Sequence, residues 1–202
     1  MENITLAVLK ADKNNIAESF KKAIAFLEKS EENFLSAFYA ADYKFIKKNE
    51  PEIFEKVKAF IEAERLQPLG VWWNSSTEEK ISDEKLARNV LYTQKFFFKK
   101  FGKIFRTGLG VKVNNPLSAE IIFSGRYNCY VEENANSDTA IYWIDAKNGY
   151  RIMGADAVQI NVKSIDDVKT AKRLPLLINS FMILFLAFLI IDEFAIIIAT
   201  PL

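Results

Sequence analysis

The sequence contains no histidine among its 202 residues. This absence excludes catalytic triads and dyads that use a histidine base of this chain, and every metal site that needs an imidazole ligand from it. Cys129 is the single cysteine, so neither an intramolecular disulfide nor a zinc site of several cysteines can form. An enzyme built from this chain would have to use carboxylates, lysine, tyrosine, serine or a bound cofactor.

The sequence also lacks an excess of either charge, with 27 Lys and Arg against 26 Asp and Glu. A net charge of +1 gives no reason to expect a nucleic-acid partner. Hydrophobic residues make up 50% of the chain and charged residues 26%, a balance typical of a globular domain. The residues after Met1 lack the basic region of a secretory signal, and Lys10 and Asp12 interrupt the first apolar stretch. We therefore expect a cytoplasmic protein.

Extended and helical patterns alternate along the first 125 residues. Strands are expected at residues 4–9, 33–40, 69–73, 103–106 and 126–132. Helices are expected at residues 15–30, from 49 onward, from 82 to 102 and at 116–124. Two further extended segments flank Asn148-Gly149, a strong hairpin signal. The alternation predicts a parallel sheet with helical crossovers, which is an α/β fold.

The expected helices rest on apolar spacing and on residues that begin or end helices. Residues 15–30 carry one apolar face at the helical period, formed by Ile16, Phe20, Ala23, Ile24 and Leu27. Asn49 is the expected cap of a helix whose first turn tolerates Pro51, because no N–H is needed there. Ser82 is the expected cap and Gly102 the expected end of the next helix, whose apolar face consists of Leu86, Val90, Phe97 and Phe101.

Residues 171–202 form a hydrophobic tail of a different kind. No charge interrupts the sequence between Pro175 and Ile191, and basic residues precede this run. About 20 apolar residues are needed to cross a bilayer core of about 30 Å. Asp192 and Glu193 weaken such a span, because acidic groups inside a bilayer cost about 2–3 kcal/mol each. Three interpretations stay open: a buried helix and strand, a membrane anchor at residues 175–202, or an end foreign to this domain.

Two short motifs have both a structural and a functional interpretation. Gly108-Leu109-Gly110 lacks the third glycine of a dinucleotide-binding loop, since Val113 occupies that position, and we interpret it as a turn after a strand. Trp73 and Asn74 end an expected strand, where an indole could stack on a sugar ring and an amide could bind its hydroxyls. The alternative is that both Trp72 and Trp73 pack the sheet against helices, one on each face.

Several segments resemble one protein family, in the family's order: NEPEIFEKVKAFIEAER at 49–65, PLGVWW at 68–73, SDEKLARNVLY at 82–92, FFFKKFG at 96–102 and AIYWIDAKNGYRIM at 140–153. The family is the N-terminal catalytic domain of the family 38 glycoside hydrolases, the α-mannosidases. The resemblance covers about residues 4–162. It implies a seven-stranded, barrel-like α/β domain at residues 1–170, incomplete by comparison with the family, followed by the tail.

The resemblance also implies a site and shows what has changed in it. The family holds zinc with a His-x-His-x-Asp motif on its first strand and a distant histidine, and uses an aspartate nucleophile on a later strand. The first motif falls on residues 8–12, where only Asp12 keeps a ligand type and Lys10 places a cation near the metal position. The nucleophile position falls on Gly110. A single carboxylate does not hold zinc, so we expect no zinc cofactor and no catalytic residue.

These observations lead to two functional hypotheses. The first is an α-mannosidase-like domain that has lost hydrolytic activity, since its zinc ligands and nucleophile are missing. The alternative is a carbohydrate-binding or interaction module for mannose-containing ligands, with Trp73 and Asn74 at the rim of its site. In that alternative the tail at 175–202 tethers the domain to a membrane. The sequence carries no signal for an oligomeric state.

Overall fold

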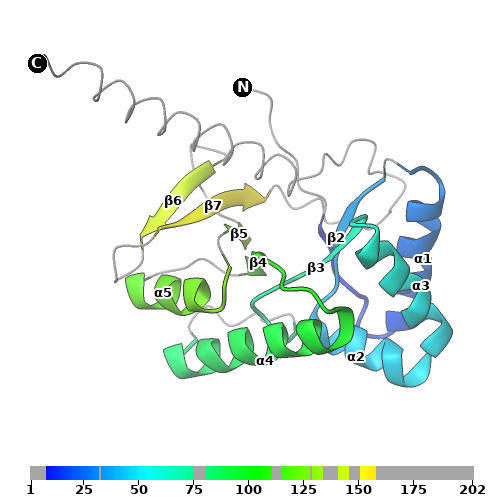
Figure 1. Ribbon diagram of the computed structural model, residues 1–202, viewed down its shortest axis with the longest axis horizontal. Coiled ribbons are helices and arrows are strands. Elements are labelled where there is room, and N and C mark those ends of the chain that lie inside the picture. The colour runs from blue at the N-terminus through cyan, green and yellow to red at the C-terminus, as the bar shows by residue number, and fades with distance from the viewer. Residues whose placement is uncertain are drawn as a thin grey trace, which may run out of the picture. The chain divides into compact units, whose positions relative to one another are not determined.

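The computed structural model describes residues 8–31, 33–74, 81–110, 115–127, 129–133, 141–145 and 151–157 (Figure 1). The chain divides into two compact units, Met1–Ala171 and Lys172–Leu202, and all described residues belong to the first. The predicted hydrophobic tail at 171–202 lies outside the described residues. Within the part of the chain that is described, no helix is both long and apolar enough to cross a membrane.

Helices and strands alternate through most of the described chain. The strands are β1 (Val8–Leu9), β2 (Leu35–Ala37), β3 (Leu66–Pro68), β4 (Thr107–Gly110), β5 (Cys129–Glu133), β6 (Ile141–Asp145) and β7 (Arg151–Ala157). The helices are α1 (Ile16–Glu28), α2 (Ala40–Asn49), α3 (Pro51–Glu62), α4 (Asp83–Phe101) and α5 (Pro116–Ser124). The α/β fold predicted from the sequence is confirmed.

The strands form two sheets whose parallel strands run in one direction. In the first sheet β2 lies between β1 and β3, with Leu9 opposite Ala37 and Ala37 opposite Pro68. In the second sheet the order is β4-β5-β7-β6, and Gly110 lies opposite Glu132. The β6–β7 pair is antiparallel, so the predicted hairpin is confirmed, although its turn at residues 146–150 lies outside the described residues.

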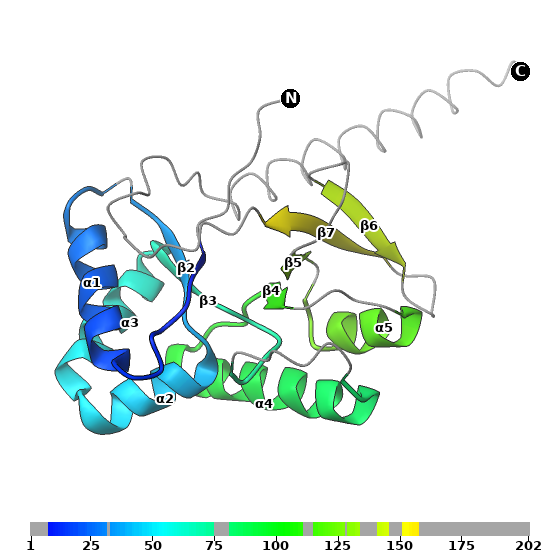
Figure 2. The same ribbon diagram turned by 180° about the vertical axis from the view of Figure 1, so that it is seen from behind.

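One isolated backbone bridge between described residues joins the two sheets. Gly70 forms an isolated parallel bridge with Gly108, and the Leu109 N–H donates to the Gly70 carbonyl over 3.4 Å. Figures 1 and 2 show the helices lying beside this row of strands. Helix α3 contacts β3, and helix α5 contacts β6 and β7. The pairings of the described strands form an open row, so the barrel-like closure stays a prediction.

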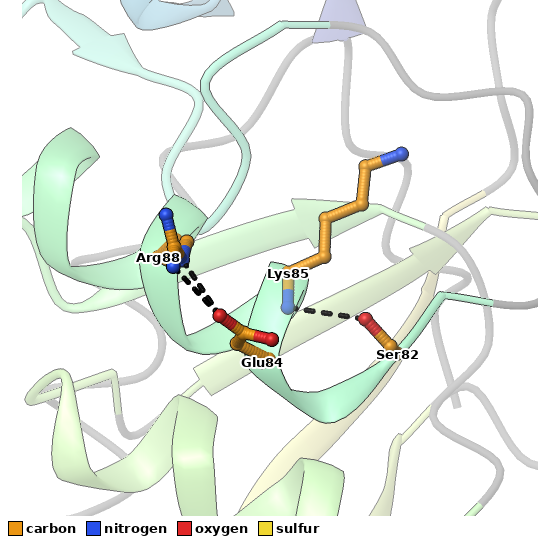
Figure 3. A network of polar contacts seen from close by, with 4 residues as sticks. All are labelled: Ser82, Glu84, Lys85 and Arg88. Carbon is orange, nitrogen blue, oxygen red and sulfur yellow. Dashed lines mark hydrogen bonds and ion pairs between the residues drawn. The ribbon is translucent and has the colours of Figure 1, made fainter.

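Helix α4 has both of the end signals predicted for it. The Ser82 hydroxyl accepts a hydrogen bond from the Lys85 N–H over 3.3 Å, which makes Ser82 the N-cap of α4 (Figure 3). Gly102 ends the helix in the left-handed conformation with a φ of 66°. Residues without glycine's freedom rarely adopt that backbone geometry. The four apolar residues expected on the inner face are buried: Leu86, Val90, Phe97 and Phe101.

An aromatic cluster joins the helices to the first sheet, and it consists of Phe20, Phe38, Tyr43, Phe97, Phe101 and Phe105. Tyr43 lies at its centre, with its ring edge-on to Phe97 at 5.9 Å and to Phe101 at 5.6 Å. The Tyr43 hydroxyl donates to the Ala37 carbonyl over 2.9 Å, which satisfies the one polar atom of a buried side chain. Burial raises the pKa of Tyr43 well above its usual value, so the hydroxyl stays protonated.

Helix α2 is an element that the sequence analysis missed, and its discovery corrects the predicted cap of α3. The Asp42 carboxylate accepts from the Tyr39 N–H over 2.9 Å, as the third residue of a helix does in a capping box. Asn49 is therefore the last residue of α2, where its side-chain amide donates to the Phe45 carbonyl over 2.9 Å. The residue in the cap position of α3 is Glu50, so the prediction of Asn49 as cap was wrong.

Two predicted strands lie at the wrong residues. The strand expected at 69–73 is β3 at Leu66–Pro68, because Val71 has a φ of 74° and the chain cannot stay extended through it. The strand expected at 103–106 is β4, four residues later. Gly108-Leu109-Gly110 therefore lies inside a strand, and its interpretation as a turn was wrong.

Candidate functional site

The five candidate residues lie at one edge of the strand row. Lys10 and Asp12 follow β1, Trp73 and Asn74 follow the bridge at Gly70, and Gly110 ends β4. Because these strands are parallel and joined in register, their carboxyl ends share an edge, here called the carboxyl edge. Open α/β sheets bind ligands at this edge. The placement is the one expected for a site, and the contacts of each side chain decide what it can do.

Asp12 is an exposed residue that shapes the turn before α1. Its carboxylate accepts from the Asn14 N–H over 2.9 Å, and its own N–H donates to the Ser19 hydroxyl over 3.0 Å. Its carbonyl accepts from the Asn15 N–H over 3.0 Å. These are the contacts of a loop that leads into a helix, and they engage one carboxylate oxygen within the turn itself.

The described residues do not fit the zinc ion of the resembled family. Tetrahedral zinc takes about four ligands from histidine, cysteine and carboxylates, and the sequence supplies no histidine. Among the described residues, no group of three His, Cys, Asp or Glu lies close enough together to hold a metal ion. Lys10 adds a cation two residues before Asp12, which opposes metal binding electrostatically.

Trp73 packs between helices, and Asn74 is exposed beside it. The half-buried indole of Trp73 lies edge-on to Phe96, with ring centroids 5.5 Å apart. The Lys44 ammonium lies 5.7 Å from the Trp73 ring, and the Trp73 N–H donates to the Asn89 side chain over 3.0 Å. Protein groups from α2 and α4 thus contact this ring. The prediction that Trp73 and Asn74 bind a sugar stays a prediction.

Gly110 faces the indole of Trp72. A Cβ atom at position 110 would lie 1.8 Å from the Trp72 Nε1 and 2.7 Å from the Tyr130 hydroxyl. The Trp72 Nε1–H donates to that hydroxyl over 3.2 Å, and both side chains are buried. The space beside Gly110 is therefore filled by an aromatic ring with a satisfied hydrogen bond, and no larger residue fits without displacing it.

Similar close approaches occur along the line where the two sheets meet, here called the glycine seam and formed by Gly70, Gly108 and Gly110. A Cβ at position 70 would lie 2.4 Å from the Tyr127 ring, and one at position 108 would lie 2.3 Å from a Val71 methyl group. Burial raises the pKa of Tyr127 above its usual value, although the Val71 backbone opposes this. Bulky side chains therefore cross the seam where glycine leaves room.

The family model for the glycosyl hydrolases family 38 N-terminal domain matches residues 5–111, which is more than half of the chain. The chain belongs to glycosyl hydrolase family 38. The matched range starts before β1 and ends at residue 111. It therefore includes the five candidate residues at the carboxyl edge, which are Lys10, Asp12, Trp73, Asn74 and Gly110.

A curated relative is an α-mannosidase, and two solved structures share the fold of this chain. Alpha-mannosidase G of Dictyostelium discoideum is 31% identical over 91 residues, which cover 45% of this chain and 8% of that protein. A family 38 protein from Enterococcus faecalis has a TM-score of 0.58 at 15% identity, with 76% of this chain and 18% of that chain covered. A 4-alpha-glucanotransferase from Thermococcus litoralis has a TM-score of 0.60 at 15% identity, covering 77% and 28%. This chain thus spans a small part of each.

The sequence analysis missed the pair formed by Trp72 and Tyr130. It assigned a possible ligand role to Trp73, and it named Trp72 only as a packing residue. A signal was present, because Gly108 and Gly110 alternate along one strand, and alternate residues share a face. Glycine at two such positions indicates a close approach from that face. The identity of the approaching ring depends on the positive φ of Val71, which no periodicity reveals.

Proposed function

We propose that this family 38 domain does not hydrolyse mannosides. The observation that carries the proposal is the environment of position 110, where the family resemblance places an aspartate nucleophile. Glycine at this position has no group that can attack a sugar carbon. The adjacent space holds the buried Trp72 indole, so no described carboxylate substitutes from that direction.

The ligand types of this chain support the same proposal. Retaining glycoside hydrolysis needs two appropriately placed acidic groups, and the family's version also needs a metal ion. Asp12 is the carboxylate at the equivalent of the first metal motif, and one of its oxygens is engaged in its own turn. Without histidine, the usual zinc ligand sets of three or four residues would need several acidic side chains at one point.

A hydrolysis assay tests the proposal directly. The purified full chain, with zinc added, is incubated with an aryl α-mannoside, and release of the phenol is measured against buffer alone. We expect no release above the uncatalysed rate. Release that depends on added metal and disappears with a chelator would overturn the proposal. Near-ultraviolet circular dichroism of the same sample verifies that the assayed protein is folded.

A second candidate function is binding of a mannose-containing carbohydrate at the carboxyl edge. It is favoured by the position of Trp73 and Asn74, because a half-buried indole next to an exposed amide provides stacking and hydrogen-bonding groups. Calorimetric titration with mannose and oligomannosides tests it, with Asn74→Ala as the variant. We expect a measurable heat that this variant reduces. Absence of heat up to millimolar ligand would count against this function.

Attachment to a membrane through residues 175–202 is a separate proposal. It rests on the uncharged run between Pro175 and Ile191 and on the basic residues before it. Cell fractionation of the full chain tests it against a variant that ends at residue 171. We expect the full chain in the detergent-extracted membrane fraction and the shortened one in the supernatant. Recovery of the full chain in the supernatant without detergent would end this proposal.

A further inference from the structure

We propose that Trp72 closes the nucleophile position of this domain, so that neither a side chain at position 110 nor a ligand ring can occupy it. The proposal deepens the proposed function and rests on its assignment of Gly110 to that position. The missing aspartate is a chemical cause for the proposed absence of hydrolysis, and the position of Trp72 adds a steric cause. A glycine in place of an aspartate removes a reactive group, whereas an indole in the adjacent space removes the room for any replacement.

The chain reaches this arrangement through an unusual backbone conformation. Val71 has a φ of 74°, which a β-branched residue rarely adopts because its side chain crowds its own backbone. The Trp72 N–H donates to the Gly70 carbonyl over 3.0 Å, which closes a tight turn around Val71. This turn ends the extended segment that crosses from the first sheet and directs residue 72 across the seam. The surrounding packing must hold such a turn in place.

The Trp72 indole occupies a buried space beside Gly110 and Tyr130, here called its seat. It is 4% exposed, and its Nε1–H donates to the hydroxyl of Tyr130, which is 0% exposed. Gly110 lies against the indole, whereas Gly108, two residues earlier on the same face of β4, faces Val71 and Tyr130. A Cβ at position 110 would lie 2.4 Å from the indole Cδ1, closer than real Cβ atoms approach other atoms. The ring and a side chain at 110 are therefore mutually exclusive.

The seat has the chemistry of a site for one flat, mostly apolar ring with a single N–H. The Tyr130 hydroxyl accepts the indole N–H, and Gly110 lies against the ring with no side chain of its own. If Trp72 is shortened, the space it leaves should take a free indole. Cavities lined by apolar groups bind small aromatic molecules of matching shape. Free indole is therefore the probe for this seat.

Indole rescue of Trp72→Ala tests whether this seat exists. We expect the thermal unfolding midpoint of Trp72→Ala to lie below that of the wild-type chain and to rise in a saturable manner with added indole. The wild-type midpoint should not respond to the same concentrations. Trp73→Ala is the matched control, because the neighbouring indole is only half-buried and its ring lies edge-on to Phe96. Failure of indole to raise the Trp72→Ala midpoint, or an equal rise in Trp73→Ala, would overturn the proposal.

A double-substitution cycle tests the exclusion between the two positions. Gly110→Asp in the wild-type background should lower the folded-to-unfolded ratio at least tenfold in urea unfolding at pH 7. The same change in Trp72→Ala should lower it at least tenfold less, because the carboxylate then has room. Equal losses in both backgrounds would overturn the proposal. If Trp72→Ala does not fold, Trp72→Phe replaces it, and the smaller ring should relieve part of the loss.

The two proposals fail in different experiments. Mannoside hydrolysis by the wild-type chain would overturn the proposed function and leave the measured seat of Trp72 unchanged. Equal effects of Gly110→Asp in both backgrounds would overturn the steric role of Trp72. The proposed absence of hydrolysis would then rest on the missing nucleophile and metal ligands alone. Neither stability measurement needs a sugar, a metal ion or a catalytic readout.

Discussion

The aromatic cluster and the glycine seam fill space in opposite ways. In the aromatic cluster, large rings from α1, α2 and α4 interdigitate, and each ring supports several others. In the glycine seam, the bulky side chains of Val71, Trp72 and Tyr127 fit because a glycine stands at the position that each of them faces. The aromatic cluster is formed by large side chains that contact one another, whereas the glycine seam requires three positions that carry no side chain.

This difference determines how each region should respond to mutation. Removing a ring from the aromatic cluster leaves a cavity, because neighbouring rings on rigid helices cannot close fully around it. Adding even one methyl group to the glycine seam forces backbone or rings apart. The seam also holds Gly110, the position to which the family resemblance assigns the nucleophile, and a Cβ there would lie 1.8 Å from the Trp72 Nε1.

The largest expected effect is the loss of Phe97 from the aromatic cluster. Its ring is fully buried and contacts the rings of Tyr43, Phe101 and Phe105. We expect Phe97→Ala to reduce the free energy of unfolding by about 3–5 kcal/mol, measured by urea denaturation. Phe98→Ala is the matched control, since Phe98 is 58% exposed, and should change it by less than about 0.5 kcal/mol. Similar losses in both variants would contradict the description of the cluster.

The next effect is overpacking of the glycine seam. We expect Gly108→Ala to reduce the free energy of unfolding by about 1–3 kcal/mol, because its Cβ would lie 2.3 Å from a Val71 methyl group. Gly108→Asn should cost more. The control is Gly102→Asn, since no atom lies within 4 Å of a Cβ there and asparagine tolerates the left-handed conformation. Denaturation curves that rank Gly102→Asn below Gly108→Asn in stability would contradict the seam.

A smaller effect is expected at the first turn of α4, away from both regions. Ser82→Ala removes the hydroxyl that accepts from the Lys85 N–H (Figure 3), which should cost about 1 kcal/mol. Glu84→Ala breaks only the exposed ion pair with Arg88, at 2.7 Å, and should cost about 0.3–0.5 kcal/mol. Near-ultraviolet circular dichroism should be unchanged in both variants, because the rings lie in the other half of the helix. An altered aromatic signal would show that the two ends of α4 are coupled.

The smallest expected effect is a pH dependence at the edge of the aromatic cluster. Burial raises the pKa of Asp42, opposed by its hydrogen bond from the Tyr39 N–H and by the charge of Lys13. The folded Asp42 carboxyl therefore keeps its proton to a higher pH than the unfolded one, so the stability that this group contributes falls as pH rises from about pH 4 through its raised pKa. Asp42→Asn keeps an acceptor for Tyr39 and removes the titration, so its stability should fall less over the same range. Unfolding curves at several pH values measure this, and parallel pH profiles would contradict it.

Local signals in the sequence were sufficient for several elements. Helix α5 has the predicted bounds, since Asn115 caps it and Pro116 occupies its first turn. Ser82 and Gly102 bound α4 as predicted. These features depend on residues within one or two turns of each other, which a sequence pattern contains. Helix α2 was missed, although Asp42 three residues after Tyr39 carried the capping signal, because tyrosine is an unusual cap residue.

The site could be predicted only in outline. Strand ends and the family resemblance singled out Asp12, Trp73, Asn74 and Gly110 as candidates, and parallel strands bring these positions to one edge. The contacts that decide their chemistry could not be predicted, because they join residues far apart in the chain. Trp72 and Tyr130 are 58 positions apart, and their hydrogen bond follows from the register between two sheets.

By itself, the sequence determined the α/β alternation, the ends of α4 and α5 and the absence of histidine chemistry, because these depend on composition and on neighbours along the chain. Only the tertiary structure decided what surrounds Gly110. A glycine in the sequence does not indicate what surrounds it, since glycine at that position is equally compatible with an open cleft and with a filled one. The turn at Val71 and the register of β4 against β5 bring the Trp72 indole and the Tyr130 hydroxyl into that space, and this packing closes it.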